Sequence, residues 1–290
     1  MEILQSLING ILLGGIYAAV GIGLSLIFGI VRMVNLAHGD LMILSAYLTL
    51  TLMHITGISP YLLLAGVIPA MFIIGFGLQF LVLNRVLGKG MEPPLLVAFG
   101  LSIIFQNGLL LIYSPDAQSL KTGLGIKSLA ITAAVNIPVI YLVGFLAGAC
   151  TIALLLVFLR CTSLGLAIRA ASDDETAARY MGINTRRIYA CAMGIAAATA
   201  AVAGTLIGTT FSFYPHSGPQ YLIIAFGVAI IGGAGSMPGT FVGGMLLGLA
   251  QLLGAYFFGT GYQLLTGYVI LLIVLALRPQ GIFGRKERSA

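Results

Sequence analysis

Residues 3–31 have the sequence ILQSLINGILLGGIYAAVGIGLSLIFGIV, a run that contains no charged side chain. About 20 consecutive apolar residues in a helix span the hydrocarbon core of a bilayer. A second run, residues 188–227, is longer still and contains no Asp, Glu, Lys or Arg. Because backbone polar groups in lipid must be paired inside the protein, runs of this length predict transmembrane helices and not the shorter strands of a barrel.

The composition of the whole chain agrees with these runs. Hydrophobic residues make up 59% of the 290 residues and charged residues only 8%, whereas soluble proteins carry about 25% charged residues. The net charge of +6 comes from basic residues scattered at the ends of apolar runs, without a clustered basic stripe. We therefore expect an integral membrane protein with no nucleic-acid partner.

Polar breaks between the apolar runs predict an all-α fold, a polytopic bundle of eight or nine transmembrane helices in a single membrane domain over residues 1–290. The count is nine if residues 221–235 span the membrane and eight if they form a re-entrant segment, in which case one end of the chain changes sides. The predicted spans are residues 3–31, 41–56, 61–84, 95–113, 138–159, 188–211, 221–235, 239–258 and 262–277.

The distribution of basic residues gives the orientation. With nine spans that start outside, only Lys121 and Lys127 of the 14 basic residues face outward. The others, from Arg32 to Arg285 and beyond, lie on the inner side, as the positive-inside rule requires.

The longest polar interval, residues 160–189, has the sequence RCTSLGLAIRAASDDETAARYMGINTRRIY and falls on the inner side. Ser172 followed by Glu175 has the spacing of a capping box, and Asp173 and Asp174 favour the positive end of a helix. Gly182 supplies a left-handed stop. These signals predict one short helix over about residues 173–181.

A helix of this length is too short to be stable alone, so it must be held by other parts of the protein or by a partner. Ala177, Ala178 and Met181 are spaced to form a small apolar face that a groove on another protein could grip. The alternative is a connector helix that lies on the membrane surface.

Several polar residues fall in or beside the predicted spans. Ser102 and Gln106 share one helix face with Asn107 beside them, and they could line a substrate path, although hydrogen bonding between helices is the favoured interpretation. Asn35 or Asp40 could cap the next helix. His38 and Asp40 are expected at a membrane surface, with His38 a hydrogen-bonded structural residue and not a metal ligand.

A glycine-rich stretch follows, AFGVAIIGGAGSMPGTFVGGMLLG at residues 225–248. It lacks the Gly-Lys-Ser/Thr ending of a phosphate loop, which argues against nucleotide binding. Its glycines and Pro238 predict a broken helix, and a break at membrane depth is tolerated where it lines a cavity or is buried. The candidate path residues here are Gly232, Gly233, Gly235 and Ser236. Asn35, His38, Ser102, Gln106 and Asn107 are the other candidates for the path.

Three stretches resemble one known family. TAARYMG at residues 176–182 looks like the E-A-A-x-x-x-G loop that importer permeases of the ATP-binding-cassette (ABC) class dock into their ATPase subunits, with Thr176 at the position of the family's Glu and Glu175 one place earlier. Residues 29–42 and 232–243 are similar to further stretches of the branched-chain amino acid permease family, and the resemblance covers nearly the whole chain.

The resemblance implies a permease subunit of an ABC importer for branched-chain or other hydrophobic amino acids in the bacterial inner membrane. The implied partners are a second homologous permease (identical or related), two ATPase subunits that bind ATP-Mg, and an external substrate-binding protein; no cofactor is implied in this chain, and no enzymatic activity. The residues expected to couple to the ATPase are Ser172, Asp173, Asp174, Glu175, Thr176, Ala177, Ala178, Arg179, Tyr180, Met181 and Gly182.

Other functions stay open at this point. Related permeases of the family import urea, amides or small aromatic acids, and the sequence does not choose among these substrates. An ion-coupled carrier usually needs ionisable residues inside the bilayer, and we expect none here away from the span ends. A membrane scaffold would not need a capped inner helix or a glycine-broken span.

Overall fold

The computed structural model describes residues 2–31, 33–90, 92–124, 127–132, 135–278 and 280–284. Four of the basic residues assigned to the inner side lie outside this part of the chain: Arg32, Arg285, Lys286 and Arg288. The helices are α1 (Glu2–Val31), α2 (His38–Thr56), α3 (Pro60–Leu81), α4 (Glu92–Tyr113), α5 (Val139–Cys161), α6 (Ser163–Asp173), α7 (Glu175–Tyr180), α8 (Thr185–Thr210), α9 (Gly218–Gly232), α10 (Met237–Phe258) and α11 (Gln263–Leu277), with short 3-10 turns η1 (Leu83–Arg85), η2 (Pro215–Ser217) and η3 (Thr260–Tyr262).

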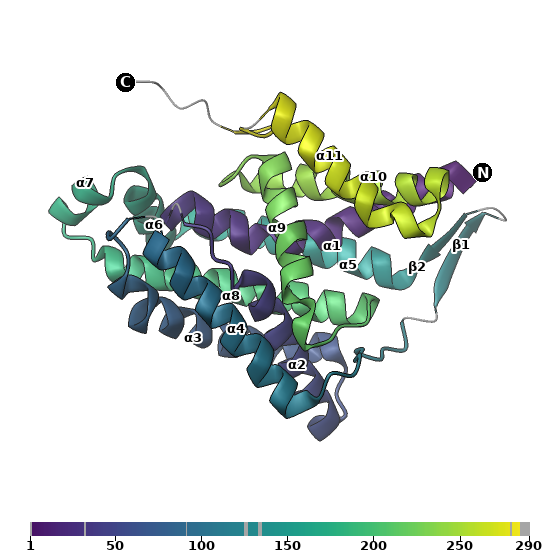
Figure 1. Ribbon diagram of the computed structural model, residues 1–290, viewed down its shortest axis with the longest axis horizontal. Coiled ribbons are helices and arrows are strands. Elements are labelled where there is room, and N and C mark those ends of the chain that lie inside the picture. Colours follow the sequence, from purple (N-terminus) through teal and green to yellow (C-terminus); the bar gives the residue numbers. More distant parts are fainter. Residues whose placement is uncertain are drawn as a thin grey trace.

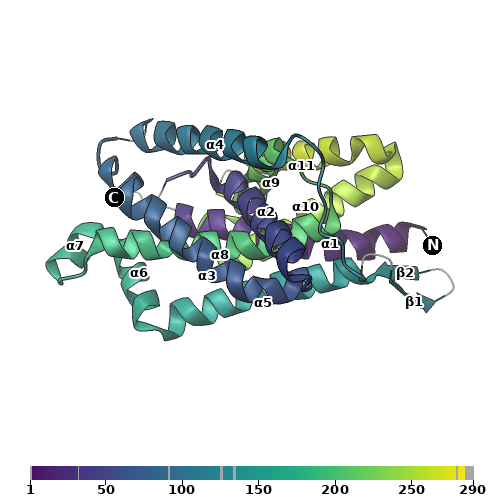
Figure 2. The ribbon, with the colours of Figure 1, turned by 90° about the horizontal axis from the view of Figure 1, so that it is seen from below.

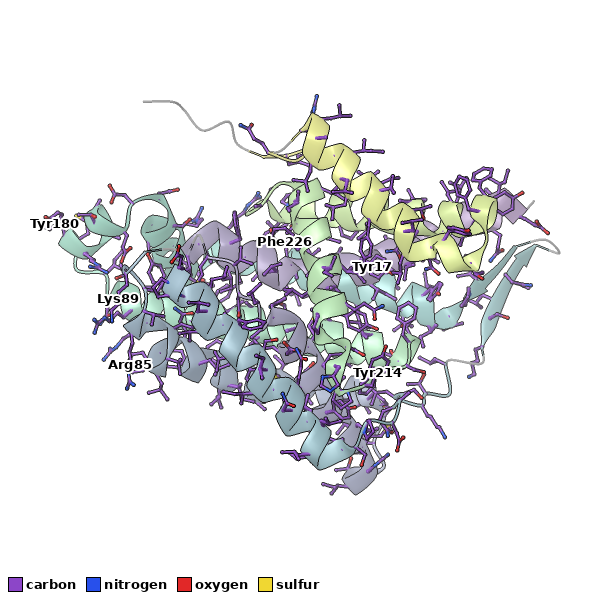
Figure 3. The ribbon with its side chains drawn as sticks, viewed as in Figure 1. Tyr17, Arg85, Lys89, Tyr180, Tyr214 and Phe226 are labelled. Carbon is purple, nitrogen blue, oxygen red and sulfur yellow. The ribbon has the colours of Figure 1, made fainter. Side chains whose placement is uncertain are left out.

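The long helices form an elongated bundle (Figures 1 and 2), with the start of α1 at one end and α7 at the other. Arg85 and Lys89 lie at the end that carries α7, as Figure 3 shows. Lys121 instead lies beside the turn between α2 and α3, at Gly57 and Pro60. We call the α7 end the inner end and the opposite end the outer end, because basic residues favour the cytoplasmic side.

Eight helices of the described chain are long and apolar enough to cross a membrane, and their bounds match eight of the predicted spans to within about three residues. The ninth predicted span, residues 221–235, coincides with α9 and the turn that follows it, and α9 is too short to cross the membrane by itself. α9 has 15 residues, which is about 22 Å of helix, and a hydrocarbon core is about 30 Å thick.

The chain nevertheless returns from the outer to the inner end through α9. Phe213 exchanges backbone hydrogen bonds with Gln118 close to the outer end of α8. At the other end of α9, Gly235 lies against Gly29 near the inner end of α1. Residues 211–217, which include the short turn η2, therefore complete the crossing, and α9 runs steeply across α1 (Figure 1).

Two helix pairs have the most extensive packing, α1 with α10 and α3 with α8. Glycine makes both possible. A Cβ at Gly14 would overlap the backbone of Met245 in α10, and a Cβ at Gly75 in α3 would overlap Ala197 and the backbone of α8. Small residues let membrane helices approach this closely, and α1 is accordingly the most buried of the long helices in the described chain.

The packing also repeats within the chain. α1 runs from the outer to the inner end and α8 runs in the opposite direction, each followed by a helix, α2 or α9, that starts inside the bundle. α1 packs on α9 and α10, the two helices that follow α8. In the same way, α8 packs on α2 and α3, the two helices that follow α1. This is the pattern of an inverted repeat, which is common among transport proteins.

The segment between α4 and α5 contains a β-hairpin. Strands β1 (Ser128–Thr132) and β2 (Val135–Pro138) pair antiparallel, with Ser128 opposite Pro138. The backbone N–H of Asn136 in β2 donates to the Gln5 side chain at 2.9 Å. The hairpin is thereby attached to the first turns of α1 at the outer end.

Candidate functional site

The inner polar interval forms two helices where the sequence predicted one. Asp174 has an extended backbone (φ −147°, ψ 106°) that separates α6 from α7. Its carboxylate accepts hydrogen bonds from the N–H groups of Thr176 (2.8 Å) and Ala177 (2.9 Å). Asp174 is therefore the N-cap of α7, and the predicted capping box of Ser172 and Glu175 is wrong.

Ser172 has a different role in the structure. It lies in the last turn of α6, and its hydroxyl donates to the carbonyl of Gly29 at 2.7 Å. Since Gly29 belongs to the inner end of α1, this bond attaches α6 to the most buried helix of the bundle. The neighbouring Asp173 is exposed.

The predicted stop at Gly182 is confirmed. Gly182 has φ +83°, and its N–H donates to the carbonyl of Arg179 while the N–H of Ile183 donates to that of Ala178, both at 3.0 Å. This pair of bonds is the Schellman arrangement, which favours glycine at the left-handed position. No atom lies within 4 Å of where a Cβ on Gly182 would be, so the backbone angle alone restricts this residue.

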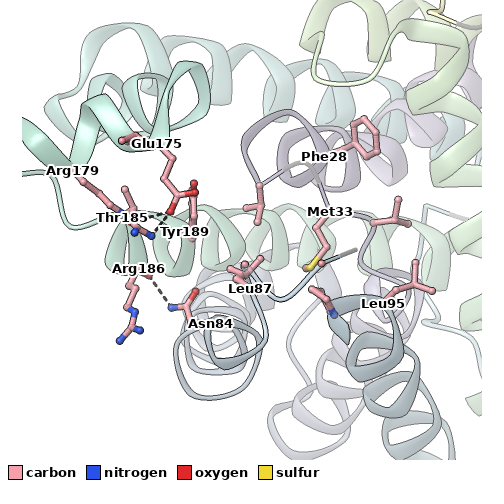
Figure 4. Close-up of a pocket in the computed structure, with 16 residues that line it drawn as sticks. Phe28, Met33, Asn84, Leu87, Leu95, Glu175, Arg179, Thr185, Arg186 and Tyr189 are labelled. Carbon is pink, nitrogen blue, oxygen red and sulfur yellow. Dashed lines mark hydrogen bonds and ion pairs between the residues drawn. The ribbon is translucent and has the colours of Figure 1, made fainter. Parts of the chain in front are cut away.

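Glu175 and Arg179 connect α7 to α8. They form an ion pair one helical turn apart, and Nε of Arg179 donates to the Thr185 hydroxyl at 3.0 Å. Figure 4 shows the three side chains converging beside Arg186, whose carbonyl accepts from Asn84 at 3.0 Å. Glu175, which lies one position before the family's Glu, therefore forms an ion pair within this chain.

The outward face of α7 differs from the predicted one. Ala178 is only 4% exposed and packs into the core, whereas Tyr180 is 87% and Met181 82% exposed. Ala177 and Thr176 are also exposed. The prediction that Ala178 lies on a docking face was wrong. Ala178 and Tyr180 are two positions apart, so their side chains point about 200° apart around the helix axis, and Ala178 faces the core. We call Thr176, Ala177, Tyr180 and Met181 the α7 tip.

A cavity of about 590 Å³ lies next to α7 at the inner end (Figure 4). Its walls come from the end of α1 with Phe28, from the segment after α3 with Leu87, and from the start of α4 with Leu95. Glu175 and Arg179 of α7 and Tyr189 of α8 complete it. The volume is within the range of small-molecule sites, and α7 and α8 form one side of the cavity.

A second polar site lies inside the bundle, where the starts of α2 and α9 meet. A Cβ at Gly218, the first residue of α9, would overlap the Asp40 carboxylate, and a Cβ at Gly39 would overlap the Gly218 carbonyl. Asp40 and His38 are each 1% exposed, so the expectation that they lie at a membrane surface was wrong. The chain turns back into the bundle after α1, which buries both residues.

The structure places Asn35 and His38 against α8. The Asn35 side chain accepts from the Ala37 N–H at 3.1 Å and donates weakly to the Met193 sulfur at 3.7 Å. The His38 ring fills the space beside Gly23 and Thr199. Asn35 thus supports the turn before α2, and both residues are enclosed by protein.

Ser102 and Gln106 come together with two residues that were not predicted to lie on the substrate path, Asp40 and His216. The Gln106 amide donates to the Ser102 hydroxyl at 3.0 Å, and its carbonyl lies 3.2 Å from Nδ1 of His216. Ser102, Gln106 and His216 are the side chains of other elements that face Asp40. A lone acidic residue between two long apolar runs was the available signal for Asp40.

Asn107 lies apart from this group. It is exposed, and its amide donates to the Ile103 carbonyl of its own helix at 2.8 Å.

The glycine-rich stretch forms the inner turn of a helical hairpin between α9 and α10. Gly233 (φ +97°) and Gly235 (φ +83°) make the turn, and the Ser236 hydroxyl caps α10 by accepting from the Gly239 N–H at 3.2 Å. Gly232 packs directly on Gly239. The predicted helix break is confirmed, and it lies at the inner end. Within the described ranges, no three His, Cys, Asp or Glu side chains gather to hold a metal ion.

Comparisons with known proteins identify relatives along nearly the entire chain. Residues 6–277 match the family model described as branched-chain amino acid transport system / permease component. The permease BraD of Pseudomonas aeruginosa is 33% identical to this chain, and LivH of Escherichia coli is 34% identical. Each comparison covers 98% of this chain and 96% of the relative. Both relatives are named high-affinity branched-chain amino acid transport system permease proteins. LivM of Escherichia coli, also named a permease of such a system, is 28% identical over 92% of this chain and 67% of its own length. No solved structure matches the chain.

Proposed function

The chain belongs to the branched-chain amino acid transport permease family, and from that premise we propose that it is a membrane-spanning permease subunit of an ABC importer. Its substrates are branched-chain or other hydrophobic amino acids, and its location is the bacterial inner membrane. The observation that carries this proposal is the near full-length similarity to BraD and LivH, combined with a bundle of long apolar helices.

The proposed complex contains a second permease, two ATPase subunits and an external binding protein. The similarity of this chain to both LivH and LivM supports pairing with a related permease. ATP-Mg is bound by the ATPases, since the glycine-rich stretch of this chain lacks the lysine of a phosphate loop. The chain itself catalyses no reaction and acts as the gated path.

The α7 tip is the proposed contact with an ATPase subunit. It exposes Tyr180 and Met181 on a helix that is held by its neighbours. The bond from Ser172 to Gly29 leads to α1, and the bond from Arg179 to Thr185 leads to α8. Because α1 and α8 are the two most buried helices, a displacement of α7 would be transmitted to the centre of the bundle. Packed helices of this kind shift as rigid bodies.

Reconstitution tests this proposal. The chain is co-expressed with the proposed permease, ATPase and binding-protein partners, purified, and placed in liposomes. We expect uptake of labelled L-leucine that requires ATP and the binding protein. Uptake that proceeds equally without ATPase subunits, or a chain that never co-purifies with them, would contradict the proposal.

A further inference from the structure

Asp40 is a buried carboxylate without a bonding partner. It is 1% exposed, and neither of its oxygens forms a hydrogen bond in the part of the chain that the structure describes. The one ion pair found among the described residues joins Glu175 and Arg179 far away, at the inner end. A buried charge that has no partner is costly, so its presence calls for an explanation.

Two helix starts account for part of the stabilisation. Asp40 lies in the first turn of α2 and also touches Gly218, the first residue of α9. The positive ends of both helix dipoles therefore face this carboxylate. Dipoles favour the ionised form without using the carboxylate's hydrogen-bonding capacity, so both oxygens stay available to a ligand.

A row of polar groups leads from Asp40 to the surface. Ser102 is 6% exposed, Gln106 is half-buried, and His216 is exposed. Gln106 lies seven residues before Tyr113, where α4 ends, which places it about 10 Å inside the membrane span. An exposed His and amide at this depth would be unfavourable against lipid. This face of α4 and η2 therefore borders a water-containing path or another permease subunit.

We propose that Asp40, Ser102, Gln106 and His216 form a binding site for the α-ammonium group of the amino acid during its passage. An ammonium group has three N–H donors and no acceptor. The Asp40 carboxylate and the Ser102 hydroxyl face one another and can accept from it. The Gln106 side chain lies beside both, with its amide nitrogen toward Ser102 and its carbonyl toward His216. His216, already bonded to the Gln106 side chain, would hold that amide in place as a positioning residue.

This site would also explain selection against similar compounds. A carboxylic acid that lacks the amino group would bring only negative charge to Asp40 and would be repelled. Charge of the wrong sign at a buried site is an effective means of rejecting a ligand. The inference rests on the proposed function, since it assigns a binding role within the same transport path.

The test uses the complete reconstituted transporter and the Asp40→Asn variant, which keeps the side-chain shape and removes the charge. Two rates are measured, ATP hydrolysis stimulated by leucine-loaded binding protein and uptake of labelled L-leucine. We expect stimulated hydrolysis to stay within about twofold and leucine uptake per ATP to fall about tenfold, the loss expected for a hydrogen bond to a charged group. If Asp40 only neutralises the helix starts, leucine uptake per ATP will be unchanged, and the proposal is wrong.

Two further variants control for folding. Thr49→Val removes a buried hydroxyl from the same helix, where Thr49 bonds the Ser45 carbonyl at 2.9 Å, and it should transport normally. Gln106→Leu removes the amide that donates to Ser102 without changing Asp40, and it should lower uptake per ATP severalfold. If Asp40→Asn fails to assemble, normal uptake by Gln106→Leu overturns the proposal. Failure of the proposed function itself is distinguishable, because the unmodified complex would then show no ATP-dependent uptake.

Discussion

The Nε atom of Arg179 in α7 donates a hydrogen bond to the hydroxyl of Thr185, the first residue of α8, across 3.0 Å. The same arginine forms the ion pair with Glu175. A six-residue helix has few contacts of its own, so this bond and the packing of Ala178 into the core link α7 to the transmembrane helices. The bond from Ser172 to Gly29 attaches the preceding helix, α6, to α1.

Replacing Arg179 with Ala should separate movement of α7 from movement of α8. Because both side chains of the ion pair are partly exposed, we expect the free energy of unfolding to change by at most about 1 kcal/mol. Leucine uptake in the reconstituted complex should nevertheless fall severalfold. Arg187→Ala, a change at an exposed arginine two residues into α8, is the control. Equal uptake by the two variants would show that the Arg179 bond has no coupling role.

Tyr180 and Ala178 allow docking to be separated from folding. Tyr180→Glu places a charge on the exposed α7 tip and should reduce co-purification with the ATPase while leaving the yield of membrane-inserted permease unchanged. Ala178→Arg forces a charge into a buried position and should lower the yield itself. If the Tyr180→Glu variant co-purifies with the ATPase as well as the unmodified protein does, the α7 tip is not the contact with the ATPase.

The cap of α7 can be identified by comparing Asp174→Ala with Ser172→Ala. Loss of the Asp174 carboxylate should destabilise α7 by about 1 kcal/mol, seen as faster hydrogen exchange at the N–H groups of Thr176 and Ala177. Ser172→Ala should leave those two amides protected. The opposite result would restore the capping box that the sequence suggested.

Gly182→Val tests the left-handed stop. A β-branched residue at φ +83° should cost about 1–2 kcal/mol and loosen the junction between α7 and α8. We expect faster proteolysis within residues 178–186 and weaker co-purification with the ATPase. Gly182→Asn should have a smaller effect, since Asn tolerates this conformation better than other side chains do; equal effects of the two substitutions would contradict the backbone explanation.

The contact between α1 and α10 predicts that Gly14 and Gly66 respond differently to the same change. A methyl group at Gly14 overlaps the backbone of Met245, whereas one at Gly66 has no atom within 4 Å. Gly14→Ala should lower the stability of the detergent-solubilised protein by about 1–3 kcal/mol, and Gly66→Ala should leave it unchanged or raise it slightly. Melting temperatures compare the two, and equal values would contradict this packing.

Sequence and structure agree where the signal is local. The bounds of α1 and α8 follow from uninterrupted apolar runs, and the stop at Gly182 follows from the backbone freedom of glycine. The cap of α7 was misassigned because Ser172 and Asp174 both have acceptor side chains at plausible positions. The choice between them depends on Gly29, which is distant in sequence and engages Ser172.

The sequence by itself determined that this chain is a helical membrane protein, where most of its helices cross, which side carries the basic residues, and which family it resembles. These properties depend on how neighbouring residues partition between water and lipid, so composition along the chain is sufficient to predict them. Only the tertiary structure decided that α9 is short, that Ala178 faces inward, and that Asp40 is buried beside Gly218. The reason is that each of these is set by contacts between segments far apart in the sequence. The chain turns back into the bundle after α1 and α8, which sets the positions of Asp40 and α9, and α7 packs Ala178 against the core.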